Sequence, residues 1–229
     1  KKARSDAGTM SLNRAIANAR HEILVAVDAD TILGRNTIQR LVRHFSDERV
    51  GAVSGNAKVG NRHNWLTRFQ SIEYIYGFNL DRRALDLLNA IPVVPGAVGA
   101  WRRSLILEAG GFSHDTLAED TDLTLALRRT GATIRYEESA IAYTEAPEDL
   151  KSLAKQRFRW VFGTLQAVWK HRDATFRLEY GSLALVTLPS IWIFQVLLAW
   201  LSPFADLAML ATLFIGNWKV VLAYYFAFF

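Results

Sequence analysis

The chain of 229 residues contains no cysteine, and this absence excludes several classes of protein. Without thiols the chain is not a disulfide scaffold, has no thiolate zinc site and uses no cysteine nucleophile. The amino end also lacks the apolar core and small-residue cleavage site of a signal peptide. Internal repeats and low-complexity tracts are absent too, and the composition is that of a chain able to bury a core of ordinary size.

Charge is scarce at the carboxyl end, where the last 52 residues hold only Glu179, Asp206 and Lys219. The first 177 residues carry the other 26 basic and 20 acidic residues, a net charge of +6. Residues 181–200 are 20 consecutive uncharged positions, and a helix of that length rises about 30 Å, enough to cross a bilayer. Residues 207–229 form a second apolar stretch. We therefore predict an α/β domain over 1–177 and a membrane region with two transmembrane helices over 178–229.

Within the first 177 residues, apolar runs of strand length alternate with helical patterns, which indicates an α/β fold. The predicted strands are 22–27, 50–57, 91–98, 133–136 and 140–143. The predicted helices are 10–20, 36–45, 65–76, 104–109, 120–129 and 152–169.

The predicted helix 65–76 places its large apolar side chains on one face, at Trp65, Phe69, Ile72 and Tyr76. Such a face either lines the core or enters a membrane interface. We expect it to line the core.

Two carboxylates follow the first predicted strand, in Asp28-Ala29-Asp30. Carboxylates separated by one residue can hold a single hard cation such as Mg²⁺ or Mn²⁺, with substrate phosphates completing its coordination. A polar turn after a strand would give the same pattern, and the spacing recurs in Asp120-Thr121-Asp122.

Glu119 and Asp120 stand at the start of another predicted helix. An acidic residue there is commonly a helix cap. The functional alternative is a general base that takes the proton from an attacking hydroxyl.

The most informative motif is Q-x-x-R-W, formed by Gln156, Arg159 and Trp160. The composition of the chain predicts only about 0.01 such matches by chance. Arginine presents a planar fork to phosphate oxygens, and an indole offers a flat surface to a sugar ring. Gly163 extends the same strip of the helix and would let another group approach its backbone.

The order Asp-x-Asp, Glu-Asp, Q-x-x-R-W and then transmembrane helices resembles the processive family-2 glycosyltransferases, the group of cellulose, chitin and hyaluronan synthases. Within that group, the segments 95–103 (PGAVGAWRR) and 108–112 (EAGGF) look most like bacterial poly-β-1,6-N-acetylglucosamine synthases.

The resemblance implies a partial GT-A fold, which is Rossmann-like, in a hexosyltransferase at the cytoplasmic face of the bacterial inner membrane. It implies that Asp28 and Asp30 hold Mg²⁺ or Mn²⁺ and the diphosphate, and that Asp120 is the catalytic base. The other residues implied to contact substrate are Glu119, Gln156, Arg159, Trp160 and Gly96.

The implied substrates are a UDP-sugar, UDP-N-acetylglucosamine for the closest resemblance, and the growing glycan. The lipid bilayer and partner or fused domains for export are further expected partners, and nucleic acid is not. One base without a nucleophile predicts a single displacement with inversion, so an α-linked donor yields a β-linkage. Seven basic residues between 151 and 177 precede the first predicted span, which places that flank in the cytoplasm.

The sequence departs from the family in two respects. The opening strands, which carry an aspartate for the uracil, are absent, and no lysine matches the one that precedes an Ala-Leu-Asn segment in the family. We therefore expect the fragment alone to be inactive. Two other functions stay open: a non-processive, lipid-linked glycosyltransferase, and an inactive membrane scaffold.

Overall fold

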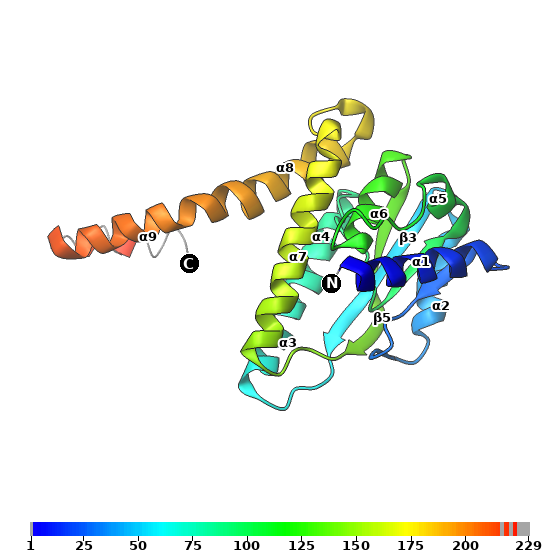
Figure 1. Ribbon diagram of the computed structural model, residues 1–229, viewed down its shortest axis with the longest axis horizontal. Coiled ribbons are helices and arrows are strands. Elements are labelled where there is room, and N and C mark those ends of the chain that lie inside the picture. Colours follow the sequence, from blue (N-terminus) through cyan, green and yellow to red (C-terminus); the bar gives the residue numbers. More distant parts are fainter. Residues whose placement is uncertain (1, 216–217, 220–221, 224–229) are drawn as a thin grey trace. The chain divides into compact units, whose positions relative to one another are not determined.

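The computed structural model describes residues 2–215, 218–219 and 222–223 (Figure 1). The chain forms two compact units, Lys1–Thr187 and Leu188–Phe229, which are described separately.

The first unit is built on a five-stranded mixed sheet. Its strands are β1 (Ile23–Ala26), β2 (Ile32–Leu33), β3 (Val50–Val59), β4 (Gly99–Arg102) and β5 (Thr133–Thr144). Their order across the sheet is β1-β4-β3-β5-β2. The long strands β3 and β5 are parallel, while β4 is antiparallel to both β1 and β3. The β1 to β4 pairing matters for the site, because it fixes the loop that follows β1.

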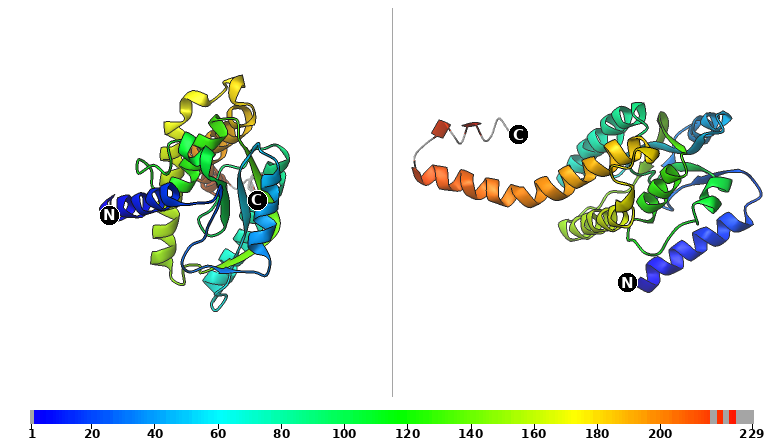
Figure 2. Two further views of the ribbon diagram at one scale, coloured as in Figure 1. Left: turned by 90° about the vertical axis from the view of Figure 1, so that its right-hand side faces the viewer. Right: turned by 90° about the horizontal axis from the view of Figure 1, so that it is seen from above.

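Seven α-helices belong to this unit in the part of the chain that is described. They are α1 (Lys2–Asn18), α2 (Thr37–Val42), α3 (Trp65–Ile75), α4 (Asp81–Leu87), α5 (Arg103–Glu108), α6 (Glu119–Arg129) and α7 (Leu150–Lys170). A π-helical turn, Tyr76–Leu80, joins α3 to α4, and 3-10 turns cover Arg43–Ser46, Arg172–Ala174 and Leu178–Tyr180. Helices α1 and α2 lie on opposite faces of the sheet, as both views of Figure 2 show.

Alternation along the strands gives the sheet two apolar faces. Val53 and Ala100 pack with Leu41 of α2 in one core, whereas their neighbours Ala52 and Trp101 belong to the other core. The second core also takes in side chains of α1, α5 and α6: Ile16, Ile106, Leu123 and Leu127. Helices therefore cover both faces of the sheet, and the α/β fold class is confirmed.

Two strand predictions were wrong in detail. Residues 91–98 form no strand, and β4 begins only at Gly99. Pro95 has no N–H for a sheet ladder, and Val98 N–H closes a turn on the Pro95 carbonyl at 3.3 Å. The predicted strands 133–136 and 140–143 are a single strand, β5, with an irregularity in its pairing opposite Gly55 and Asn56.

The expectation that one face of α3 lines the core was also wrong. Trp65, Phe69 and Tyr76 are each more than 60% exposed, and Ile72 is 54% exposed. The opposite face is buried instead, and it includes Gln70, whose amide donates to the Pro147 carbonyl at 2.8 Å. Periodicity located the helix, but the buried face is the one that combines the apolar Leu66 and Tyr74 with Gln70.

The second unit consists of α8 (Leu188–Ser190), a π-helical stretch (Ile191–Leu197) and α9 (Leu198–Ile215). In the described residues, one helix, Leu183–Ala211, is long and apolar enough to cross a membrane. Helix α9 continues through Pro203 and so joins the end of the first predicted span to the start of the second. Most of the second predicted span beyond Ile215 lies outside the described residues.

Candidate active site

A cavity of about 1070 Å³ opens beside the carboxyl end of β1 in the first unit. Segments far apart in the sequence form its wall: the β1 loop, the loop before β4, the start of α6 and the middle of α7. All eight of the site residues predicted from the sequence line it: Asp28, Asp30, Gly96, Glu119, Asp120, Gln156, Arg159 and Trp160. The structure therefore brings the three motifs together at one place.

Asp28 and Asp30 stand in a tight turn after β1, in which Thr31 N–H donates to the Asp28 carbonyl at 3.1 Å. Thr144, at the end of β5, directs its hydroxyl to Asp30 Oδ1 at 3.4 Å. Gly96 lies directly against the other carboxylate, because a Cβ atom there would be 3.0 Å from Asp28 Oδ1. A side chain at residue 96 would push Asp28 away from its present position.

The electrostatics at Asp28 fit a bound cation. Partial burial raises the pKa of the Asp28 carboxyl, the charges of Asp30 and Glu119 raise it further, and Arg159 opposes them. A divalent cation would relieve this repulsion between carboxylates. The described residues contain no cluster of three or more His, Asp or Glu side chains suited to a metal ion. Asp28 and Asp30 are a pair of carboxylates that could hold Mg²⁺ or Mn²⁺ if substrate oxygens supplied the remaining ligands.

Asp120 lies in the first turn of α6 but does not cap the helix, because the N-cap residue is Ala118. Its Oδ1 accepts the Thr121 N–H at 2.8 Å, and the carboxylate lines the cavity half-buried. Burial and the charge of Glu119 raise the pKa of Asp120 to about 6. A carboxylate with such a pKa is ionised at pH 7 and still basic enough to accept a proton.

The Q-x-x-R-W residues face the cavity from α7. Gln156 Oε1 is buried and has no hydrogen-bond partner among the described residues, which is the state expected of a group that meets a bound molecule. Arg159 is exposed and Trp160 is half-buried, with the Arg157 guanidinium 4.6 Å from the indole centroid. Arg157 also forms an ion pair with Glu73 of α3 at 2.6 Å, which ties the two helices together.

Gly163 permits a close approach, as the sequence predicted, and the approaching group is the chain itself. A Cβ atom on Gly163 would lie 2.5 Å from the backbone nitrogen of Ala118. One turn further along α7, Gln166 Oε1 accepts the Leu117 N–H at 3.0 Å. Helix α7 therefore fixes the backbone immediately before Asp120.

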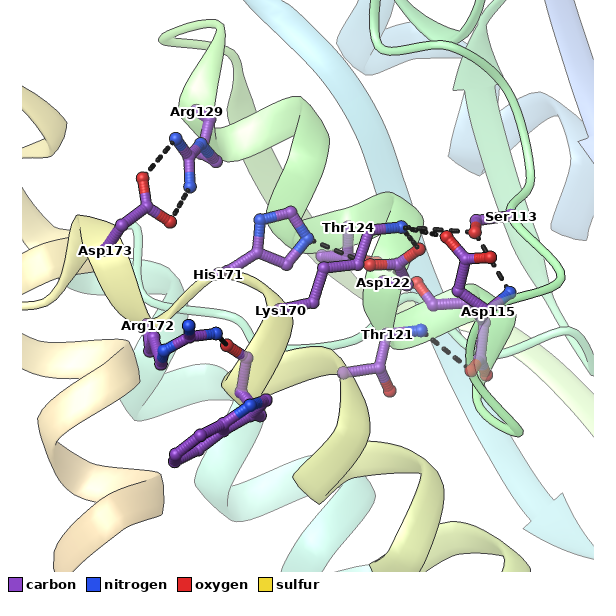
Figure 3. Close-up of polar contacts among 12 residues, drawn as sticks. Ser113, Asp115, Thr121, Asp122, Thr124, Arg129, Lys170, His171, Arg172 and Asp173 are labelled. Carbon is purple, nitrogen blue, oxygen red and sulfur yellow. Dashed lines mark hydrogen bonds and ion pairs between the residues drawn. The ribbon is translucent and has the colours of Figure 1, made fainter.

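A second link between α6 and α7 is the charged cluster in Figure 3. Asp122, which is 3% exposed, contacts His171 Nε2 at 2.9 Å and Lys170 Nζ at 2.8 Å. Lys170 also contacts Asp115 at 3.3 Å. These partners outweigh the effect of burial and lower the pKa of Asp122. The end of α7 thus holds α6 from the side away from the cavity.

Other residues of the cavity wall were missed from the sequence: Tyr74, Phe78, Arg82, Thr144 and Glu145. Phe78 and Arg82 stand four residues apart, the spacing of one helical face, which is the only signal in the sequence for them. Nothing else in the sequence indicated that the Arg82 side chain would be buried.

Comparison with known proteins identifies the family of the chain. Residues 23–228 match the family model described as "Glycosyl transferase family group 2". Among curated proteins, the poly-beta-1,6-N-acetyl-D-glucosamine synthase of Staphylococcus aureus (strain COL) is 28% identical over 193 residues, which cover 82% of this chain and 47% of that protein. The synthase of the same name from Staphylococcus epidermidis is 27% identical over 192 residues. The chain spans about half the length of the curated relatives it matches.

A solved structure has the same fold. The mannosyltransferase PcManGT from Pyrobaculum calidifontis, in complex with GDP-Man and Mn²⁺, superposes with a TM-score of 0.62. The match covers 94% of this chain and 63% of that one, at 23% identity. The likeness shows that the first unit has the GT-A-like fold.

Proposed function

The chain belongs to glycosyl transferase family group 2, and from this premise we propose that it is the acceptor-side part of a membrane-bound, metal-dependent, inverting hexosyltransferase. The observation that carries the proposal is the meeting of Asp28 and Asp30, Asp120 and the Q-x-x-R-W residues in one cavity. No single motif would suffice, because each has a structural explanation of its own.

Asp120 is the base of the proposed reaction. The acceptor hydroxyl gives its proton to the carboxylate as its oxygen forms a bond to the anomeric carbon, and the bond from that carbon to the diphosphate oxygen breaks. The electron pair of that bond leaves with the nucleoside diphosphate. A single displacement inverts the anomeric centre, so an α-linked donor gives a β-linked product.

The leaving group accumulates negative charge, and two parts of the cavity suit it. Arg159 presents its guanidinium to the diphosphate from α7. A divalent cation held by Asp28 and Asp30 would neutralise the same oxygens. Trp160 and the unpartnered Gln156 carbonyl oxygen remain for the sugar ring at the end of the acceptor.

We further propose UDP-N-acetylglucosamine as donor and a growing poly-N-acetylglucosamine chain as acceptor. The support is the similarity to the two staphylococcal synthases over 82% of the chain. Processive extension follows from the same similarity.

Membrane association is supported by two exposed apolar surfaces in addition to the apolar helix Leu183–Ala211. One lies on α3, with Trp65 and Phe69, and the other on α7, with Phe158 and Phe162. The ion pair between Arg157 and Glu73 links these two helices. We propose that they rest on the cytoplasmic face of the inner membrane, where exposed cations such as Lys151 and Arg172 would meet anionic headgroups.

The test is transfer of labelled N-acetylglucosamine by membranes that contain the full-length protein. Arg159→Ala should reduce transfer by about 100-fold or more, because leaving-group charge loses a fixed cation. Lys155→Ala, an exposed cation on the same helix, is the matched control and should retain activity.

Chelation of divalent metal should abolish transfer, and Mg²⁺ or Mn²⁺ should restore it. Product length distinguishes a processive synthase from a non-processive, lipid-linked glycosyltransferase. Addition of a single sugar to a lipid would identify the non-processive enzyme. Undiminished polymer from Arg159→Ala would contradict the assignment of the site.

A further inference from the structure

Phe78 lies in the π-helical turn Tyr76–Leu80, which joins α3 to α4. Tyr74, Phe78 and Arg82 follow one another at intervals of four residues, and all three side chains line the cavity. In a continuous α-helix each such interval drifts by about 40° around the axis. A π-helical turn takes more residues per revolution and so counters this drift, and such turns are frequent at functional sites. The turn therefore keeps the three side chains on the cavity side.

Phe78 contacts both of its neighbours in this row. Its ring centroid lies 4.5 Å from that of Tyr74, and the Arg82 guanidinium lies 4.7 Å from the Phe78 centroid. The same guanidinium donates a hydrogen bond to Ser54 Oγ of β3. Tyr74 and Arg82 are 5% and 3% exposed. Phe78 is therefore held between two buried side chains, one of which is fastened to the sheet.

Phe78 also contacts the indole of Trp160 on α7. The two ring centroids are 6.2 Å apart and the ring planes make an angle of 82°, the edge-to-face arrangement that aromatic pairs favour. Both side chains are half-buried, line the cavity and pack against the same apolar core. Rotation of the indole about its side-chain bonds would break the edge-to-face contact. Phe78 thus opposes a change in the orientation of Trp160.

We infer that Phe78 is a positioning residue for the acceptor: its edge-to-face contact holds the indole of Trp160 in the orientation in which it meets the terminal sugar. The inference rests on the proposed function, in which Trp160 binds the acceptor. A side chain already held in its bound orientation loses less conformational entropy on binding. Loss of the Phe78 ring should therefore weaken acceptor binding, whereas donor binding at Asp28, Asp30 and Arg159 should stay unchanged.

The test measures separate KM values for donor and acceptor, using the full-length protein in membranes. The substrates are UDP-N-acetylglucosamine and a soluble β-1,6-linked N-acetylglucosamine oligomer. Phe78→Ala should raise the acceptor KM by about fivefold to tenfold, the worth of an aromatic pair, and the donor KM by less than about twofold.

Three further variants separate the ring of Phe78 from its volume. Phe78→Tyr keeps the ring and should keep the wild-type acceptor KM. Phe78→Leu fills the space without a ring and should raise the acceptor KM, which also supplies the comparison if Phe78→Ala does not fold. Leu80→Ala is the matched control, because Leu80 belongs to the same turn but is 53% exposed and does not line the cavity. It should behave as wild type.

A second measurement reports on the indole directly and needs no substrate. The full-length protein is labelled with fluorotryptophan, and the fluorine NMR signal of Trp160 is assigned by its loss in Trp160→Phe. In Phe78→Ala this signal should shift and narrow, because the ring gains motion. Phe78→Tyr and Leu80→Ala should leave the signal in place.

Equal acceptor KM values in wild type and Phe78→Ala would overturn the inference. A parallel rise of both KM values, or a fall of kcat with both KM values unchanged, would overturn it as well, because either result would show a purely structural role. An unchanged fluorine signal in Phe78→Ala would refute the positioning of the indole. If the wild type transfers no sugar while the fluorine signal depends on Phe78, the proposed function is refuted and the positioning of Trp160 stands.

Discussion

Asp120 and Asp122 stand two residues apart on α6, yet they experience opposite environments. Asp122 is enclosed by His171 and Lys170, and its pKa is lowered. Asp120 accepts one backbone N–H, faces the cavity, and has a pKa of about 6. Residues at this spacing point to nearly opposite sides of a helix. One side of α6 therefore stabilises the fold, while the other side carries the proposed base, for which the described residues provide no ion pair.

The largest effect should come from the cavity side. Asp120→Asn should lower the transfer rate by about 1000-fold, because a general base contributes 10²–10⁴ to rate. The ionised form of Asp120 is disfavoured in the folded protein, since its pKa is raised, so its removal should not destabilise. At pH 7.5 the variant should melt at the wild-type temperature or about 2–5 °C above it. The difference should shrink as the pH falls below 6 and vanish below pH 3.8, where Asp120 is protonated in both the folded and the unfolded chain. A marked drop in melting temperature would assign Asp120 a structural role.

The second prediction concerns Asp122, on the other side of α6, where a substitution should affect stability more than activity. Asp122→Asn should lower the free energy of unfolding by about 3 kcal/mol at pH 7, because Lys170 and His171 lose the buried carboxylate that both contact. A lowered pKa means that the pairing stabilises above pH 4 and is lost as the carboxylate becomes protonated, so the difference from wild type should shrink below pH 4. Transfer should fall by less than about tenfold. Denaturant unfolding at several pH values gives the measurement.

A third substitution tests the close contact between Gly163 of α7 and Ala118, which precedes α6. Gly163→Ala places a methyl group against Ala118, which must move, and should reduce transfer by about tenfold through displacement of Asp120. Stability should fall by about 1–3 kcal/mol. Gly8→Ala in α1 is the control, because a Cβ atom there meets no atom within 4 Å. Equal activity of the two variants would show that the loop before Asp120 adjusts freely.

The smallest effect should come from the exposed link between α3 and α7. Glu73→Gln removes the ion pair with Arg157 and should change the free energy of unfolding by less than about 1 kcal/mol, and less still at high salt. A loss of stability comparable with that of Asp122→Asn would mean that the exposed pair stabilises the fold as much as the buried cluster around Asp122.

Sequence patterns predicted the positions of the helices and strands better than they predicted which side chains are buried. The helical stripe at Trp65 and Phe69 located α3 correctly, but both side chains are exposed while Gln70 is buried. Periodicity identifies a helical face, but packing and hydrogen bonds with other parts of the fold decide which face is buried. Likewise, the apolar run 91–98 has the composition of a strand but forms none. Pro95 has no N–H to donate to a sheet, and a turn closes between Pro95 and Val98.

The candidate site likewise contains residues that the sequence predicted and residues that it did not. Motif order was sufficient to select the residues of the three motifs, and they line one cavity. Arg82 could not be selected, because a lone arginine in a polar helix is ordinarily solvated. Its burial depends on Ser54 and Phe78, which lie on other segments, and on a π-helical turn that sequence does not reveal.

The contact of Gly163 with Ala118 has a consequence for any attempt to recombine these enzymes. Helix α7 and the segment at Leu117 and Ala118 fit each other without room for a single methyl group. A chimaera that imports residues 150–170 from a relative, to alter the glycan that is made, would therefore need the relative's residues 117–120 as well. The two segments should be exchanged, and should vary, as one unit.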